Sequence, residues 1–408
     1  MIHHIFPGNL VLHVPYMIDI LVRHAHEIGV AEDEQIFYLY KTTDRHRINY
    51  DHIGLPADRL KFRKGRKLDA SLWSNLKKND IIIFHSAFFE GMWFSLLLRP
   101  RIWENTAVLH WGGDVANYYR QKHHLMRQAI NSLNNDVKRN LHRLQPRDKI
   151  VRPHRKLAGK LKRMLYGLIE PRLRSIILSR LGVIGTGTPG EFNIINEMHG
   201  PCDNYMPMVF YTNTSDLTPS SRTKPGNKLG ILLGNSGWGS NNHIEVLSWL
   251  SQFKNENIQV ICPLGYPPPS PYIYEVIETG KRLLGDKFTP LLDVIPKSEY
   301  NDLLATIDVF ILNAKRQQGL YNVYASLLNG KKVYLSPDSP TYGMLREWGT
   351  KVFDVRHIAS SSFHEFSSFS PEDAEKNHEI GQQHFSLQAT LRSFNSLIIR
   401  MRNGKGTQ

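Results

Sequence analysis

Short apolar runs alternate with helix-length segments along most of the chain, and this pattern is typical of a parallel sheet with crossover helices. After the first run, apolar residues recur at helical spacing behind Pro15, and Gly29 is placed to close that helix. The strands expected in the first half are His3–Phe6, Gln35–Tyr40, Ile81–Phe84, Ala107–Leu109 and Gly182–Ile184.

The same rhythm is clearer in the second half. The strands expected there are Leu229–Leu233, Ile258–Cys262, Phe288–Leu292, Val309–Leu312 and Lys332–Leu335. Helices are expected to begin near Asn241, Pro271, Lys297, Gly319 and Pro340. The chain is therefore expected to form an α/β protein with two Rossmann-like halves.

A polar stretch without apolar periodicity, TNTSDLTPSSRTKPGN, occupies residues 212–227 and is typical of a linker. It predicts an N-terminal domain over 1–211 and a C-terminal domain over 228–373. Residues 374–408 are expected to form closing helices.

The positive charge is concentrated in one segment. The chain carries a formal net charge of +14. Residues 120–180 contain 17 Lys and Arg against three acidic residues, whereas the other 347 residues hold 34 of each sign. From Leu157 to Leu181 the basic residues alternate with Leu, Ile and Met. This amphipathic insertion favours an anionic partner, either a membrane surface or nucleic acid. The alternative is a helix that packs on the N-terminal domain and leaves its basic face in solvent.

The two cysteines, Cys202 and Cys262, are too few for a disulfide framework and point to a reducing compartment. The start, MIHHIFPGNL, has no signal-peptide features. Polar residues interrupt the longest apolar tract, Ile81–Leu98, which is expected to be a strand, a loop and a helix. We therefore expect a cytoplasmic protein that does not cross a membrane.

The most distinctive local feature is a glycine-rich turn, GNSGWGS, between the strand at Leu229–Leu233 and a helix. Glycines let a backbone approach a ligand closely, and a helix start favours an anion such as a diphosphate. The alternative is a tight turn with Ser240 as the N-cap of the helix.

Two other loops follow strands at the same edge of the predicted sheet. Lys315 and Arg316 come after Val309–Leu312, where their charge suits a phosphate, or they lie on a solvated turn. Tyr266 follows Ile258–Cys262, where its ring suits a nucleotide base, or it belongs to a Pro-rich loop.

In the N-terminal half, His85 and Asp114 each follow a predicted strand. Either residue suits a general base that takes a proton from an acceptor hydroxyl. The alternative interpretation is a buried core imidazole for His85 and a helix cap for Asp114. The histidines lack metal-ligand spacing, and the sequence has no Asp-x-Asp run, so we expect neither a metal nor a cofactor.

Three stretches, ILLGNSGWGSNNHI (231–244), CPLGYPPPSPYIYEV (262–276) and AKRQQG (314–319), resemble glycosyltransferase family 56. Weaker agreement occurs at FHSAFFEGMW (84–93) and HWGGDV (110–115). This is the family of TDP-N-acetylfucosamine:lipid II N-acetylfucosaminyltransferases of enterobacterial common antigen synthesis. The resemblance implies a GT-B fold, with two Rossmann-like domains facing across a cleft. It also implies a metal-independent hexosyltransferase.

The resemblance implies that the donor, a nucleoside-diphosphate sugar with TDP and N-acetylfucosamine expected, binds the C-terminal domain. The acceptor, a polyprenyl-diphosphate-linked saccharide, is expected on the N-terminal domain near Gly8, Asn9 and Trp111. Asp114 is our first choice as catalytic base and His85 the second. The residues predicted to bind the nucleotide sugar are Gly234, Asn235, Ser236, Gly237, Ser240, Asn241, His243, Tyr266, Lys315, Arg316, Gln317, Gln318 and Gly319.

A lipid-linked acceptor gives the basic insertion a role, because basic residues hold a protein at an anionic surface. We therefore expect a peripheral protein on the cytoplasmic face of the inner membrane. The membrane-facing residues predicted are Arg155, Lys156, Lys160, Lys162, Arg163, Arg172 and Arg174. The alternative functions are a nucleic-acid-binding protein that uses segment 120–180 and an inactive protein that binds a sugar nucleotide.

Overall fold

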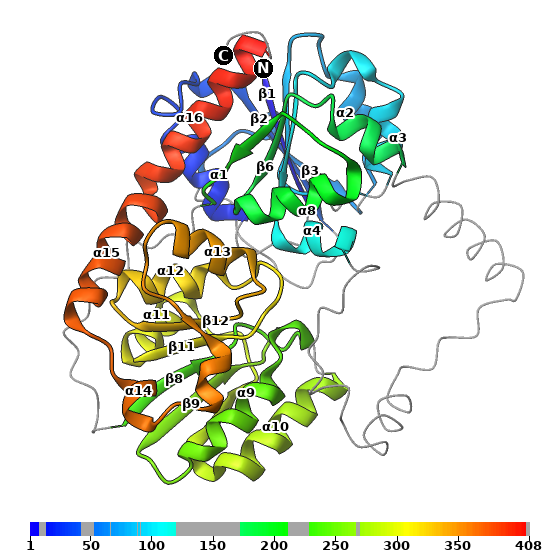
Figure 1. Ribbon diagram of the computed structural model, residues 1–408. Coiled ribbons are helices and arrows are strands. Elements are labelled where there is room, and N and C mark those ends of the chain that lie inside the picture. The colour runs from blue at the N-terminus through cyan, green and yellow to red at the C-terminus, as the bar shows by residue number, and fades with distance from the viewer. Residues whose placement is uncertain are drawn as a thin grey trace, which may run out of the picture. The chain divides into compact units, whose positions relative to one another are not determined.

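The computed structural model describes residues 1–7, 14–41, 53–65, 67–87, 89, 91–119, 172–210, 228–266 and 270–404 (Figure 1). Contacts within the chain divide it into two units. The described parts of the first unit, here the first domain, come from residues 1–119, 148–213 and 387–408. The second domain takes its described parts from 214–386. The predicted linker, 212–227, lies outside the described residues.

The first domain contains a seven-stranded parallel sheet with the strand order β3-β2-β1-β4-β5-β6-β7. The strands are β1 Ile2–Pro7, β2 Gln35–Lys41, β3 Leu60–Lys64, β4 Ile81–Phe84, β5 Thr106–His110, β6 Val183–Thr186 and β7 Tyr205–Pro207. The helices are α1 Val14–Arg23, α2 Ala70–Ser74, α3 Met92–Leu97, α4 Gly112–Tyr119, α8 Pro189–His199 and α16 Leu387–Asn403. Short 3-10 turns are η2 Glu32–Glu34 and η4 Pro100–Ile102.

The central strands of this sheet are buried on both faces because helices cover each side. Phe6, Ile83 and Leu109 belong to one core cluster with residues of α1 and α16. Ile5, Ile82 and further alternate residues face the opposite cluster, to which α2, α3 and α8 contribute.

The second domain contains a six-stranded parallel sheet with the order β10-β9-β8-β11-β12-β13. The strands are β8 Leu229–Leu233, β9 Ile258–Pro263, β10 Phe288–Leu291, β11 Val309–Leu312, β12 Lys332–Leu335 and β13 Phe353–Asp354. The helices are α9 His243–Leu250, α10 Pro271–Leu284, α11 Lys297–Thr306, α12 Leu320–Leu328, α13 Pro340–Glu347, α14 Phe363–Ser367 and α15 Pro371–Phe385. The 3-10 turns are η5 Gly239–Asn241, η6 Ser251–Phe253, η7 Gly285–Lys287 and η8 Val355–Ala359.

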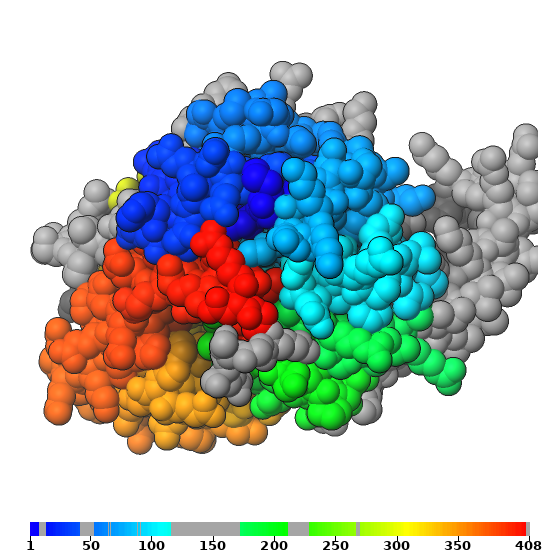
Figure 2. All heavy atoms as spheres, turned by 90° about the horizontal axis from the view of Figure 1, so that it is seen from above, coloured from blue at the N-terminus to red at the C-terminus, as the bar shows by residue number. Residues whose placement is uncertain are grey.

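The predicted closing helices are present as α15 and α16, but they do not form a unit of their own. Phe385 of α15 stacks on Tyr324 of α12 in the second domain. Helix α16 belongs to the first domain, where Phe394 and Leu397 enter the core beside α1. The space-filling view shows its red atoms between blue and cyan atoms of that domain (Figure 2).

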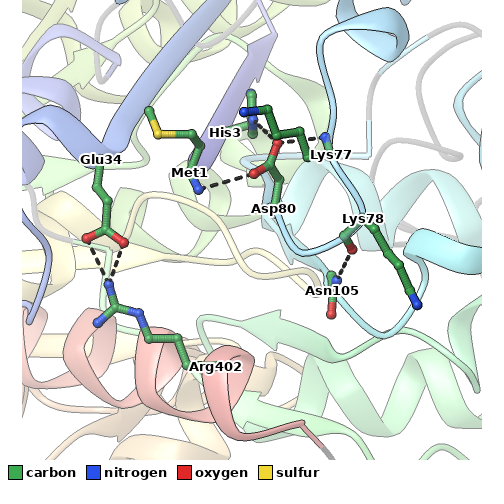
Figure 3. Close-up of polar contacts among 8 residues, drawn as sticks. All are labelled: Met1, His3, Glu34, Lys77, Lys78, Asp80, Asn105 and Arg402. Atoms are coloured by element: carbon green, nitrogen blue, oxygen red, sulfur yellow. Dashed lines mark hydrogen bonds and ion pairs between the residues drawn. The ribbon is translucent and has the colours of Figure 1, made fainter.

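Polar contacts fasten the end of α16 at the amino-terminal edge of the first sheet. Arg402 donates two 2.9 Å hydrogen bonds to the Glu34 carboxylate (Figure 3). It also donates one of 2.6 Å to the Gly29 carbonyl. At the same edge the Asp80 carboxylate contacts the chain's amino group at 3.2 Å and His3 Nε2 at 3.0 Å. The last helix therefore closes the first domain.

If α16 is part of this core, its buried and exposed aliphatic residues should differ in their contribution to stability. Leu397 is fully buried, whereas Ile399 is 51% exposed. We expect Leu397→Ala to lower the free energy of unfolding of the first domain by about 2–5 kcal/mol. The control, Ile399→Ala, should change it by about 0.5 kcal/mol or less. Urea denaturation followed by circular dichroism measures both, and equal losses would contradict this role of α16.

Candidate functional site

The strand order of the second sheet reverses at β8, which lies between β9 and β11. Ile231 of β8 pairs with Val260 on one side and Val309 on the other. Because parallel strands present their carboxyl ends at one edge, the loops after β8, β9 and β11 meet there, at the position where open α/β sheets bind ligands. The three loops predicted to bind the nucleotide sugar are those loops.

The turn after β8 requires glycine at position 234. Gly234 has φ = +75°, and a Cβ atom there would lie 2.4 Å from His243 Nε2. The buried Asn241 side chain holds the rest of the turn. Its Oδ1 accepts a hydrogen bond from the Asn235 N–H at 3.1 Å, and its Nδ2 donates to the Ser236 and Trp238 carbonyls at 3.0 Å. Asn241 therefore fixes the conformation of the turn.

Side-chain hydrogen bonds connect this turn to the loop after β11. Ser240 Oγ donates to Gln318 Oε1 at 2.8 Å, and Gln318 Nε2 donates to Asn235 Oδ1 at 3.3 Å. Gly319 has φ = +63°, and its missing Cβ would lie 3.0 Å from the Asn235 side chain. The two loops are thus in direct contact, and the predicted residues on them are brought together.

The alternative role considered for Ser240, an N-cap, is wrong. Residues 239–241 form η5, and the N-cap of α9 is Asn242, which has φ = 50° and no side-chain capping bond. Asn242 Nδ2 instead donates to the Asn313 carbonyl at 2.7 Å, and Asn313 Nδ2 donates to Glu245 at 2.6 Å. These contacts were missed because they join residues about 70 positions apart in the chain.

His243 is buried at the start of α9. Its backbone N–H donates to the Tyr272 hydroxyl at 3.1 Å, and its Nδ1 lies 3.0 Å from the same oxygen. Burial lowers the pKa of His243 to about 3, so the ring is neutral at physiological pH. Its ring fills the space below Gly234, which makes it a support of the turn. Tyr272 lies within the stretch 262–276 but was not predicted as a site residue.

The two predicted cations of this edge differ in their contacts. Lys315 Nζ lies 3.5 Å from the Asp338 carboxylate. Arg316 Nε donates to Ser240 Oγ at 3.4 Å, so its guanidinium lies against the turn after β8. Gln317 is buried beside it, and its carbonyl accepts a bond from Arg316 Nη1 at 3.3 Å. Arg316 is therefore the better placed of the two for a diphosphate.

Tyr266 lies at the same edge after β9, and its carbonyl accepts a hydrogen bond from the Gly237 N–H at 2.7 Å. Its side chain is 54% exposed. Among the described residues, no group of three or more His, Cys, Asp and Glu side chains is arranged to hold a metal ion.

Asp114 is buried in the first turn of α4, in the first domain. Its Oδ1 accepts a hydrogen bond from Ser86 Oγ and its Oδ2 one from the Trp111 N–H, both at 2.8 Å. These are the contacts of a helix cap. Burial raises the pKa of Asp114 to about 7, against the lowering effect of the N–H and hydroxyl donors. A pKa near 7 suits a general base, but both oxygens already have partners.

His85, the second choice for a base, lies in the core of the first domain. Its Nε2 is 3.0 Å from His4 Nδ1, and its ring stacks on Phe6 with a centroid distance of 3.9 Å. Phe394 of α16 stacks beyond it. Burial places the pKa of His85 well below its usual value. This packing is that of a core imidazole, which is the alternative interpretation of His85.

The remaining predictions for the first domain fall partly on described residues. Trp111 is half-buried and stacks on Phe210 at 4.6 Å. The Arg174 guanidinium lies 5.5 Å from the Trp93 ring, so this half-buried side chain packs into the domain, which does not fit its predicted membrane-facing role. Arg172 is exposed. Gly8, Asn9, Arg155, Lys156, Lys160, Lys162 and Arg163 lie outside the described residues.

A family model matches the part of the chain that contains these loops. Residues 161–330 match the family described as 4-alpha-L-fucosyltransferase, glycosyl transferase group 56. The match contains the stretches 231–244, 262–276 and 314–319, whereas 84–93 and 110–115 precede it. The predicted family resemblance is therefore confirmed, and the chain is a glycosyltransferase.

Solved structures of similar fold confirm the GT-B class. A Rickettsia africae ESF-5 glycosyltransferase is 12% identical with a TM-score of 0.60, and the alignment covers 98% of this chain and 97% of that chain. The Thermosynechococcus elongatus sucrose-phosphate synthase is 12% identical with a TM-score of 0.65, covering 98% and 99%. Anabaena HepE, solved in complex with UDP and glucose, is 10% identical with a TM-score of 0.58, covering 99% and 100%.

Within the described ranges, no helix has both the length and the apolar character that crossing a bilayer requires.

A side chain at position 234 should disrupt the loops predicted to bind the nucleotide sugar. In Gly234→Ala the left-handed backbone costs about 1–3 kcal/mol, and the methyl group displaces His243. We expect a lower melting temperature and loss of nucleoside-diphosphate binding. The control is Gly343→Ala in α13, where nothing lies within 4 Å of the added Cβ and alanine favours the helix. Calorimetry on both variants tests this, and unimpaired binding in Gly234→Ala would contradict the site geometry.

The buried Asp114 carboxyl should make stability depend on pH. It keeps its proton up to about pH 7 when folded but ionises near 3.8 when unfolded. Between these values the folded state binds more protons, so the free energy of unfolding falls as pH rises, by about 1.4 kcal/mol per pH unit.

Comparison with Asp114→Asn isolates this effect, because the buried histidines are common to both proteins. The stability of the wild type relative to the variant should fall steadily from pH 4.5 to 6.5 in denaturation experiments. A constant difference over that range would show that Asp114 has an ordinary pKa.

Proposed function

We propose that this glycosyltransferase transfers N-acetylfucosamine from TDP to a polyprenyl-diphosphate-linked saccharide, in bacterial surface polysaccharide synthesis of the enterobacterial common antigen type. One observation carries the proposal. The loops after β8 and β11 are joined by the Ser240–Gln318–Asn235 hydrogen bonds at the reversal point of the second sheet. Both loops lie within the segment that matches the family.

Transfer requires that the departing nucleoside diphosphate be stabilised as its negative charge grows. Arg316, held against Ser240, supplies a positive charge beside the turn. Helix α12 begins after Gly319, which offers no side-chain cap, so its first N–H groups and the helix dipole are suited to an anion. Together these groups form the proposed diphosphate site.

The acceptor hydroxyl must lose a proton as the new glycosidic bond forms. In this proposal Asp114 accepts that proton, because its pKa of about 7 suits proton transfer near neutral pH. One of its present hydrogen bonds, from Ser86 or Trp111, must then be exchanged for one from the acceptor.

The acceptor's polyprenyl chain places the reaction at a membrane. The basic residues of segment 120–180 are proposed to hold the enzyme at the anionic cytoplasmic face of the inner membrane, with Arg172 among them. Arg174 is left out because it packs on Trp93.

One transfer assay tests these elements together. The lipid-linked acceptor is placed in vesicles, with TDP-N-acetylfucosamine as donor and the corresponding UDP, GDP and CMP sugars as alternatives. We expect product with the TDP sugar, and faster transfer from anionic than from neutral vesicles at low salt. Asp114→Asn should turn over about 100- to 10,000-fold more slowly, with the KM for the donor unchanged.

Each part has its own contradicting result. Donor binding without transfer or hydrolysis would identify an inactive sugar-nucleotide-binding protein. Equal rates on both vesicle types would remove the membrane role, and near-normal turnover by Asp114→Asn would remove the base.

A further inference from the structure

Two aromatic side chains stand exposed at the carboxyl edge of the second sheet. Trp238 is 45% exposed and Tyr266 is 54% exposed. Their ring centroids are 6.3 Å apart, with an interplanar angle of 76°. Aromatic rings contribute most to stability or binding when they are buried, so an adjacent exposed pair at a ligand-binding edge indicates a surface that a ligand covers.

Hydrogen bonds hold the backbone of both residues in place. The Gly237 N–H donates to the Tyr266 carbonyl at 2.7 Å, and Asn241 Nδ2 donates to the Trp238 carbonyl at 3.0 Å. Gly237 permits this close approach, because a Cβ there would lie 2.6 Å from Ile273. The backbone that carries the exposed pair is therefore pre-organised, which limits the conformational entropy that a ligand must remove.

Two exposed apolar side chains flank the exposed Asp293 in the loop after β10. Gly265 lies against the backbone of Asp293, because a Cβ on Gly265 would be 2.6 Å from the Asp293 carbonyl carbon. The neighbours of Asp293, Leu292 and Val294, are 54% and 60% exposed. The edge thus has two parts: one with Arg316 at β8 and β11, and one with two exposed aromatic rings at β8 and β9, beside Leu292, Asp293 and Val294 after β10.

A nucleoside diphosphate has the same two parts, an anionic diphosphate and a flat heterocycle. Adjacent strands are about 4.8 Å apart, so the loops after β11 and β9 are separated by about 10 Å. With the diphosphate at Arg316 and the start of α12, the base extends toward Trp238 and Tyr266. Since the two rings are nearly perpendicular, a base that stacks on one ring lies nearly perpendicular to the plane of the other.

We propose that Trp238 and Tyr266 form the surface on which the base of the donor nucleotide stacks. Trp238 is thereby a binding residue of this site that the sequence did not indicate. The inference rests on the proposed function, because it needs the diphosphate at the adjoining loops. Stacking on an aromatic side chain is worth about 5- to 150-fold in affinity per base.

The test compares a ligand that has a base with one that has none. Titration calorimetry measures the Kd of TDP and of inorganic pyrophosphate for the wild type, Trp238→Ala, Tyr266→Ala and Trp238→Phe. We expect each alanine variant to bind TDP about 5- to 150-fold more weakly and pyrophosphate within twofold of the wild type. Trp238→Phe should recover most of the TDP affinity.

Tyr274→Ala is the matched control. Tyr274 is 57% exposed on α10, two residues after Tyr272. Two residues correspond to about 200° around a helix, so Tyr274 faces away from Tyr272 and from the glycine turn that Tyr272 contacts. Its replacement should leave both Kd values unchanged.

The outcomes separate the two proposals. If the wild type binds TDP and the alanine variants bind it equally well, the stacking role is wrong while the diphosphate site stands. An equal loss of TDP and pyrophosphate binding would show that the rings support the loops and do not contact a base. If the wild type binds neither ligand, the proposed function is overturned together with this inference.

Discussion

The arrangement of the loops at the carboxyl edge of the second sheet depends on the contact between the turn after β8 and the loop after β11. Parallel pairing brings the two loops to one edge of the sheet, but pairing alone does not order them. Ser240, Gln318 and Asn235 provide that order, and Gly319 lacks the Cβ atom that would meet the Asn235 side chain. Buried polar groups must be satisfied, so Asn241 and Asn242 fix the turn in one conformation.

The two domains place ionisable groups in different environments. In the second domain the predicted cation Arg316 stays at the surface of the hydrogen-bonded loops, where an anion can meet it. In the first domain Asp114 and His85 follow adjacent strands but are buried, and burial moves their pKa values in opposite directions, toward the neutral form of each. Because both groups are neutral, burying them in the first domain costs less free energy than burying two charges.

Much of the fold could be predicted because central parallel strands are buried on both faces and appear as continuous apolar runs. The expected bounds of Leu229–Leu233, Val309–Leu312 and Lys332–Leu335 coincide with β8, β11 and β12. Strands β3, β7 and β13 were missed. They lie at sheet edges, where LKFRK, YMP and the two-residue β13 carry little apolar signal. The pattern of residues 374–401 predicted helices, but amphipathicity does not say which core a helix covers.

The site shows the same division. The glycines and the basic pair at the strand ends could be predicted as site residues from their residue types, and these residues do meet at one edge of the sheet. Their hydrogen-bond partners could not be predicted, because the Ser240–Gln318 and His243–Tyr272 contacts join distant parts of the chain. Ser240 was considered as a cap because a serine before a helix usually is one; here η5 shifts the start of the helix past it.

The most direct measurement of the central claim is hydrogen–deuterium exchange with and without TDP. Binding at the reversal point of the second sheet predicts slower exchange of the backbone N–H groups in residues 234–243 and 314–323, with the strand interiors unchanged. Protection that leaves these two segments unaffected and appears only in the first domain would contradict the account.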